Sequence, residues 1–190
     1  DWSSDVCSSD LWPGDPARGA AIVGGRLICA GQVFETDRPA WHSRTLEPAA
    51  VAELNSFAWL DDLEAQGDEP ARRRARDLIA DWLERAPDWH PVAWAPHVVG
   101  QRVANWLTHA AFLARGRTDE LGPRILASLT RQATHLGRTL GSGAEGVSRL
   151  LAIKGLLYAS LCGVGGARRA AKALRRLDRK STRLNSSHIT

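Results

Sequence analysis

Four residues of the segment "GQRVANWLTHAAF" combine the side chain types that bind acidic sugars. Arg102, Asn105, Trp106 and His109 follow the spacing i, i+3, i+4 and i+7, which places them on one face of a helix. A guanidinium, an amide and an imidazole can bind a carboxylate or a sulfate, and an indole ring can lie against a sugar. The alternative is that Trp106 belongs to the hydrophobic core and the polar residues flank it at the rim. The spacing therefore indicates either a binding face or the edge of a core.

Two further clusters of aromatic and polar residues lie on either side of this segment. The proline-rich loop "APDWHPVAWAP" carries rings that either bind sugars and stacked bases or close the ends of helices as core residues. The segment "RQATHLGR" places a glutamine on an apolar stripe, where a buried amide needs hydrogen-bond partners, so a structural network and a ligand site both stay open. The residues are Trp89, His90, Trp94 and His97 in the loop, and Arg131, Gln132, His135 and Arg138 in the second cluster, with Lys154 beyond it.

Hydrophobic periodicity predicts a mainly α fold that would position these residues. Short apolar runs broken by glycines predict a small β-hairpin over residues 20–35, followed by irregular chain to Asn55. Ser56 is expected to cap the first helix, and short loops between the later helices indicate helical hairpins packed antiparallel. One predicted helix, residues 147–163, is apolar on most faces, which is typical of a helix buried between others. The predicted helices cover residues 56–66, 70–85, about 96–113, about 118–140, 147–163 and a sixth from about 166.

The two ends of the chain differ in composition from the Ala-, Leu- and Arg-rich sequence between them. A common sequencing-library adapter, read in frame, encodes Asp1–Leu11, and its reverse complement encodes Asp178–His188. We therefore expect residues 1–11 and 178–190 to derive from the adapter and to carry no fold information. Residues 12–55 are then the hairpin and its irregular lead-in, and residues 56–177 are a truncated helical domain. The natural sequence is expected to be an internal fragment.

The natural part of the chain is mildly basic. Residues 12–177 hold 22 Lys and Arg against 17 Asp and Glu, which suits an anionic partner or reflects a genome that favours Ala and Arg codons. Cys29 and Cys162 have no metal-ligand spacing, so neither a disulfide framework nor a metal site is expected. Since no apolar run approaches the roughly 18–20 residues of a membrane span, membrane insertion is not expected. The P-loop, nucleophile-elbow, zinc-protease and dinucleotide-binding signatures are absent.

Several segments, taken in order, resemble the N-terminal part of heparinase II/III family proteins, a group of bacterial polysaccharide lyases and their relatives. They cover essentially all of residues 12–177, and they are "WPGDPARGAAIVGGRLICAGQVF", "LNSFAWLDDLEAQG", the loops at Trp89 and Trp94, "GQRVANWL", "ILASLTRQATHLGR" and "LAIKGLLYASL". The resemblance implies an incomplete α/α toroid, followed in the parent protein by an antiparallel β domain that lies beyond Leu177. It also implies β-elimination on a uronate-containing polysaccharide and is compatible with a periplasmic location.

The chain departs from this family at the positions that carry its chemistry. Where family members have a Gly-Asn-His-like motif, this chain has residues 145–148, Glu-Gly-Val-Ser, and its one tyrosine, Tyr158, lies mid-helix among Leu and Ala. We therefore expect no catalytic residue, no metal and no cofactor here, and an inactive fragment whose partner is an acidic polysaccharide. A helical-repeat module that binds a protein is the alternative, and a nucleic-acid-binding domain is less favoured because no recognition helix is evident. The expected substrate-binding residues are Trp94, Arg102, Asn105, Trp106, His109 and His135.

Overall fold

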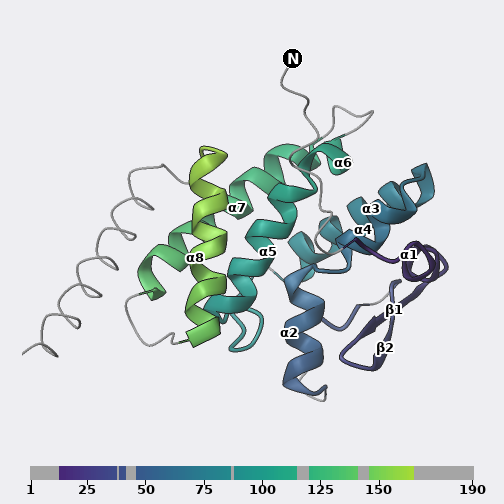
Figure 1. Ribbon diagram of the computed structural model, residues 1–190, viewed down its shortest axis with the longest axis horizontal. Coiled ribbons are helices and arrows are strands. Elements are labelled where there is room, and N and C mark those ends of the chain that lie inside the picture. Colours follow the sequence, from purple (N-terminus) through teal and green to yellow (C-terminus); the bar gives the residue numbers. More distant parts are fainter. Residues whose placement is uncertain are drawn as a thin grey trace, which may run out of the picture.

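The protein is mainly helical, with one small antiparallel sheet. The computed structural model describes residues 13–37, 39–41, 46–86, 88–114, 120–140 and 146–164. Both adapter-like ends and the helix expected from about residue 166 lie outside this range. Figure 1 shows α1 and the β-hairpin at one side of the molecule and α8 at the other. The elements are α1 Pro16–Val23, β1 Arg26–Cys29, β2 Gln32–Glu35, α2 Pro48–Ser56, α3 Leu60–Gln66, α4 Glu69–Arg85, α5 Pro96–Thr108, α6 Ala110–Ala114, α7 Leu121–Thr139 and α8 Gly146–Leu161.

The longer helices begin and bury their apolar faces as the sequence predicts. In α4, Pro70 lies in the first turn and the Asp68 carboxylate accepts a hydrogen bond from the Ala71 amide at 2.8 Å, which satisfies one of the unpaired amides of a helix start. The predicted stripe is confirmed, because Ala75, Leu78, Ile79 and Trp82 are buried and Leu83 is partly buried. The helix α7 falls within its predicted range, and α8 begins one residue before the predicted start and ends two residues before the predicted end.

The N-terminal region contains more helix than predicted. The prediction of strand from residue 20 is wrong, because residues 20–23 belong to α1 and the hairpin begins at Arg26. Within the hairpin Leu27 pairs with Phe34 on the buried face and Ile28 with Val33 on the exposed face. The prediction of irregular chain up to Asn55 is also wrong, since α2 occupies residues 48–56. Both missed helices are short and begin with a proline, a residue that also signals a loop.

The corner between α2 and α3 differs from prediction in a way that matters for the site. Ser56 does not cap a helix that follows it; it is the last residue of α2. Phe57 then takes a left-handed conformation with φ of 60°, which is strained for a bulky side chain. The helical chain resumes only at Leu60. The strained turn separates α2, which was not predicted, from α3, which is the C-terminal part of the helix predicted over residues 56–66.

Aromatic packing around Phe57 holds this strained turn in place. Phe57 is fully buried, and its ring lies 4.8 Å from Trp59, 5.2 Å from Trp106, 5.6 Å from Trp41 and 6.0 Å from Trp82, measured between ring centroids. The contacts with Trp82 and Trp106 are edge-to-face, a favoured arrangement of aromatic rings. These rings come from segments on both sides of the corner, so the core itself stabilises the unfavourable backbone.

Two glycines let α5 and α8 approach until their backbones touch. A Cβ atom at Gly100 would lie 2.2 Å from the Leu151 carbonyl oxygen, and one at Gly155 would lie 2.5 Å from the Gly100 carbonyl oxygen. The other side of α8 is not covered as its apolar sequence predicts, because Val147, Leu150 and Leu161 are exposed in the described part of the chain. Nor does α5 continue through Ala110, which was predicted to point inward and is exposed; α5 ends at Thr108.

Candidate functional site

The predicted face of α5 exists, and it points at the corner between α2 and α3. Arg102 donates a hydrogen bond to the Asn55 carbonyl and Asn105 donates one to the Ser56 carbonyl, both at 2.9 Å. Trp106 packs edge-on against Phe57. His109 lies against carboxylates of α3. The four side chains therefore contact the corner in chain order: the first meets the end of α2, and the last meets α3.

These contacts complete the C-terminal end of α2. The last four carbonyl groups of a helix have no partner within it and need one elsewhere. Here each of the four accepts a side-chain hydrogen bond, and two of the donors, Arg102 and Asn105, come from α5. A cation beside a helix C-terminus is also favoured by the helix dipole. The pairs are Ser56 Oγ to Glu53 O at 2.7 Å, Trp59 Nε1 to Leu54 O at 3.1 Å, Arg102 Nη1 to Asn55 O and Asn105 Nδ2 to Ser56 O at 2.9 Å.

Arg102 is fully buried and its hydrogen bonds go to neutral groups. Its Nε donates to the Gln132 side-chain oxygen at 2.8 Å and its Nη1 also donates to the Ala93 carbonyl at 3.1 Å. The guanidinium lies 4.5 Å from the Trp82 ring centroid, within the range of a cation–π interaction. Burial lowers the pKa of Arg102 to about 9, and the charge of Arg131 contributes further. The side chain is therefore still protonated at neutral pH.

Asn55 joins this arginine to the tryptophan core. The Asn55 amide donates to the Trp41 and Val51 carbonyls and its oxygen accepts from Trp82 Nε1, all at 2.9 Å. Gln132, predicted to need partners because it lies on an apolar stripe, has them in Arg102 and in Ser128 Oγ at 3.1 Å. Hydrogen bonds within a buried polar network rigidify a core, although Nη2 of Arg102 has no hydrogen-bond partner among the described residues. Asn55 was missed by sequence reasoning, which placed it at the end of an irregular stretch.

Trp94 and His135 lie at the outer edge of this network. Trp94 is buried at 6% exposure, and His135 Nε2 donates to its carbonyl oxygen at 3.0 Å. The two rings meet edge-to-face at 5.2 Å. The guanidinium of the exposed Arg131 lies 5.6 Å from the Trp94 ring centroid, and that of Arg102 lies 5.7 Å from it. Trp94 therefore links an exposed arginine to the buried one.

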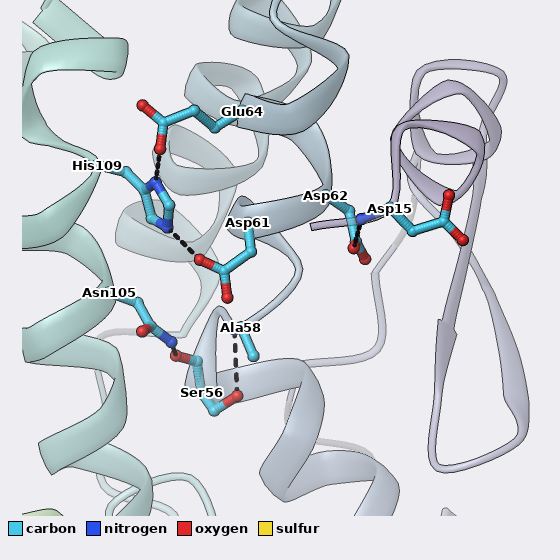
Figure 2. Close-up of polar contacts among 8 residues, drawn as sticks. All are labelled: Asp15, Ser56, Ala58, Asp61, Asp62, Glu64, Asn105 and His109. Carbon is cyan, nitrogen blue, oxygen red and sulfur yellow. Dashed lines mark hydrogen bonds and ion pairs between the residues drawn. The ribbon is translucent and has the colours of Figure 1, made fainter. Parts of the chain in front are cut away.

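His109 is held between two acidic residues of α3, as Figure 2 shows. Its ring is buried, its Nε2 lies 2.8 Å from the Asp61 carboxylate, and its Nδ1 contacts Glu64. Burial lowers the pKa of His109, but the hydrogen bonds and charges of Asp61 and Glu64 outweigh it, so that the pKa is raised overall. With both ring nitrogens facing carboxylates, the imidazolium form fits this position.

The opposite side of α3 is held to α1 through the neighbouring carboxylate. Asp62 accepts a hydrogen bond from the Asp15 amide at 2.9 Å and forms an ion pair with Arg18 at 3.2 Å. Burial raises the pKa of Asp62, and the Asp15 amide and Arg18 oppose that change. Sequence reasoning missed Asp61, Asp62 and Glu64, although the segment "LDDLE" places acids on both sides of one short helix.

The remaining aromatic and polar candidates lie apart from this network. Trp89 is exposed at 70%. His90 Nδ1 accepts hydrogen bonds from the Val92 and Ala93 amides at 3.3 Å, which shape the loop. Two of the remaining candidates make contacts on α8: a hydrogen bond of 3.2 Å joins His97 to Ser148, and Lys154 lies 5.8 Å from the Tyr158 ring centroid.

The structure thus divides the six predicted binding residues into two groups. Arg102, Asn105 and Trp106 on α5, together with His109 directly after it, form a seam along the α2–α3 corner. The other two, Trp94 and His135, lie at its outer edge. Their role toward a ligand stays a prediction. Within the described residues no group of three or more His, Cys, Asp or Glu side chains could hold a metal ion. None of the described helices has both the length and the apolar composition to cross a membrane.

Comparison with known proteins gives one distant relative. The chain is 33% identical over 129 residues to FtsZ-localized protein C of Caulobacter vibrioides (strain NA1000 / CB15N), an alignment that covers 67% of this chain and 22% of that protein. The chain therefore spans about a fifth of the length of the curated relative that it matches. No family model matches the chain, and no solved structure matches it.

Proposed function

We propose that this chain is the non-catalytic helical part of a larger heparinase II/III-like protein that acts on uronate-containing polysaccharide. In this proposal the helices form part of an α/α toroid. One observation carries the non-catalytic role: the α5 residues best suited to chemistry are spent on the α2–α3 corner. Arg102 and Asn105 cap α2, and His109 is bound at both ring nitrogens. The substrate class comes from the family resemblance of the sequence.

The proposed chemistry of the whole protein is β-elimination. A base removes the proton at C5 of the uronate, the electron pair forms a C4–C5 double bond, and the C4–oxygen bond breaks with the leaving oxygen taking up a proton. Such a step needs a group that neutralises the carboxylate and a side chain that transfers the proton. Tyr158 lies on α8, where its ring meets Lys154, and it is not one of the residues that face the α2–α3 corner, so this chain supplies neither group by position. The reacting side chains belong to other parts of the protein.

Product absorbance tests this proposal directly. The full-length gene product is incubated with polygalacturonate, alginate and heparan sulfate, and the ultraviolet absorbance of the unsaturated product is followed. We expect a signal with at least one uronate polymer for the whole protein and no signal for the present chain. Silence of the whole protein on every polymer would contradict the lyase assignment. Turnover by the chain alone would contradict its non-catalytic role.

A second candidate is a protein-binding module of the division machinery. It is favoured by the similarity to a protein named for its localization with FtsZ and by the exposed apolar side of α8, where Val147 is 71%, Leu150 66% and Leu161 85% exposed. Apolar side chains gathered on one side of a surface helix are typical of a protein contact. In this reading the helices serve as a scaffold for that surface.

Co-sedimentation with FtsZ polymers separates this candidate from the first. The chain is mixed with polymerised Caulobacter FtsZ, and the pelleted fraction is compared with that of a Leu150→Gln/Leu161→Gln variant. Val33→Gln, a change at an exposed apolar residue of the hairpin, is the matched control. Loss of pelleting with the α8 variant alone would support the module, and no pelleting of the unchanged chain would refute direct binding to FtsZ.

A further inference from the structure

Charge is divided unevenly along the chain. Residues 12–88 hold 14 Asp and Glu against nine Lys and Arg, whereas residues 89–177 hold three Asp and Glu against 13 Lys and Arg. The helices α5, α7 and α8 contain no acidic residue at all. An asymmetry of this size between two halves of a chain points to an anionic partner on the basic half. A codon bias toward arginine does not explain why 14 of the 17 acids lie in the other half.

Three arginines of α7 form a row on the outer surface of this basic half. Arg124, Arg131 and Arg138 are seven residues apart and all three are exposed. Seven residues make almost two full turns of an α-helix, so the three side chains project from one side, with about 10 Å of helix between neighbours. The positions between them on that side include Ala127, Thr134 and the partly exposed His135. The row is therefore a line of positive charge about 20 Å long.

The surroundings of the row favour binding of an outside anion. Arg124 meets Glu84 at 3.5 Å, but both side chains are largely exposed, and such pairs contribute little. Arg131 is positioned by the Trp94 ring, which His135 fixes in turn. Beneath them lies the buried charge of Arg102, which is close enough for Arg131 to lower its pKa. Two like charges this close to each other raise the electrostatic gain from an anion at Arg131.

We propose that the α7 arginine row, Arg124, Arg131 and Arg138, binds a linear acidic polysaccharide along the helix. This inference rests on the proposed function and names the surface of this chain that would hold the polymer. An extended ligand is required, because a small anion can reach only one arginine of the row. Nucleic acid fits less well: Trp94, whose ring contacts Arg131, is 6% exposed, so its ring face is not available for the base stacking that single strands use.

The test measures binding by the chain and by two matched triple variants. The first is Arg124→Gln/Arg131→Gln/Arg138→Gln. The second removes the same charge from the acidic half, where Arg26, Arg73 and Arg85 are exposed, as Arg26→Gln/Arg73→Gln/Arg85→Gln. The ligands are polygalacturonate, neutral dextran of similar length and single-stranded DNA, at low and physiological salt. Circular dichroism spectra confirm that all three proteins fold alike.

We expect polygalacturonate to bind and dextran not to bind, with affinity falling as salt rises. An exposed ion pair changes a binding constant by a factor of about 1.5 to 5, so loss of the three arginines of the row should raise the dissociation constant by about three- to hundredfold. The control variant should raise the dissociation constant by less than half of that factor. Equal binding by the row variant, an equal loss in both variants, or tighter binding of DNA than of polygalacturonate would overturn the inference. If the full-length protein cleaves a uronate polymer but the row variant binds polygalacturonate as tightly as the unchanged chain does, the row is refuted and the lyase is not. Binding without cleavage would refute the lyase and leave the row standing.

Discussion

Gly100→Ala should destabilise the protein, although alanine is the better helix former. The new methyl carbon would lie 2.2 Å from the Leu151 carbonyl oxygen and 2.7 Å from the Ala152 Cα atom. Both are backbone atoms of α8 and cannot rotate away. To reach ordinary contact at about 3.4 Å, the helices must move apart by about 1.2 Å, and gaps of about 1 Å forfeit up to half of the dispersion energy at a contact.

The magnitude follows from two opposing effects. Replacing glycine by alanine within a helix favours folding by about 1 kcal/mol, and overpacking a tight contact typically costs about 1–3 kcal/mol and occasionally more. Because the obstacle at Gly100 is backbone, we take the upper part of that range, about 2–3 kcal/mol, and expect a net loss of about 1–2 kcal/mol after the propensity gain. Urea unfolding followed by circular dichroism measures the difference in the free energy of unfolding.

Gly137→Ala is the matched control for this measurement. Gly137 also lies within a helix, and a Cβ atom there would have nothing within 4 Å. It should therefore show the helix-propensity effect alone, a gain of about 0.5–1 kcal/mol. If Gly100→Ala stabilised the protein as much as Gly137→Ala does, the close approach of α5 and α8 would be refuted.

Three further changes test the caps and the buried network. Arg102→Met should lower the free energy of unfolding in urea by about 2–4 kcal/mol. It leaves buried acceptors on Asn55 and Gln132 unsatisfied, each at a cost of about 1–3 kcal/mol, and it relieves the cost of a buried charge. An unchanged unfolding midpoint would show that the cost of burying the charge cancels the hydrogen bonds. Asp68→Ala removes the cap of α4 and should cost about 0.5–2 kcal/mol, with no loss expected from Asp68→Asn. The raised pKa of His109 means that its contribution to stability is complete below the unfolded-state value of about 6.5 and is lost as pH rises through the folded-state pKa. The free energy of unfolding should therefore fall as pH rises through this window in the native chain and change less in His109→Gln. Parallel pH profiles of the two proteins would refute the pairing of His109 with Asp61 and Glu64.

Helices whose signal is local were predictable from the sequence. The stripe through Ala75, Leu78, Ile79 and Trp82 repeats at helical spacing over a long segment, and an apolar stripe of that length has few alternatives. The α2–α3 corner was not predictable, because Phe57 adopts its left-handed conformation only against rings from distant segments. Local propensity disfavours that conformation, so only tertiary packing could reveal the break.

The candidate site was predicted as a set of residues but not by what it faces. The spacing of Arg102, Asn105, Trp106 and His109 correctly placed them on one face. Whether such a face meets a ligand or another helix depends on the neighbours, and two of the partners here are backbone carbonyls, which any residue supplies. Asp61 and Glu64 were recognisable as acids, but they lie 45 or more residues before His109 in the chain. Their pairing with His109 could be predicted only if the turn at Phe57 were already placed correctly.

The contacts of α5 are the reason that we place the proposed binding surface on α7. One side of α5 is consumed by the corner through Arg102 and Asn105, and another meets the α8 backbone at Gly100. A ligand that competed for Arg102 would have to uncap α2 and break the bond to Gln132, at a cost of about 1–3 kcal/mol for each acceptor left unsatisfied. The arginines of α7 carry no such penalty within the described part of the chain, where the ion pair between Arg124 and Glu84 is exposed. A charged ligand therefore gains more on the outer row than in the buried seam, even though the seam holds the residues that look most like a binding site.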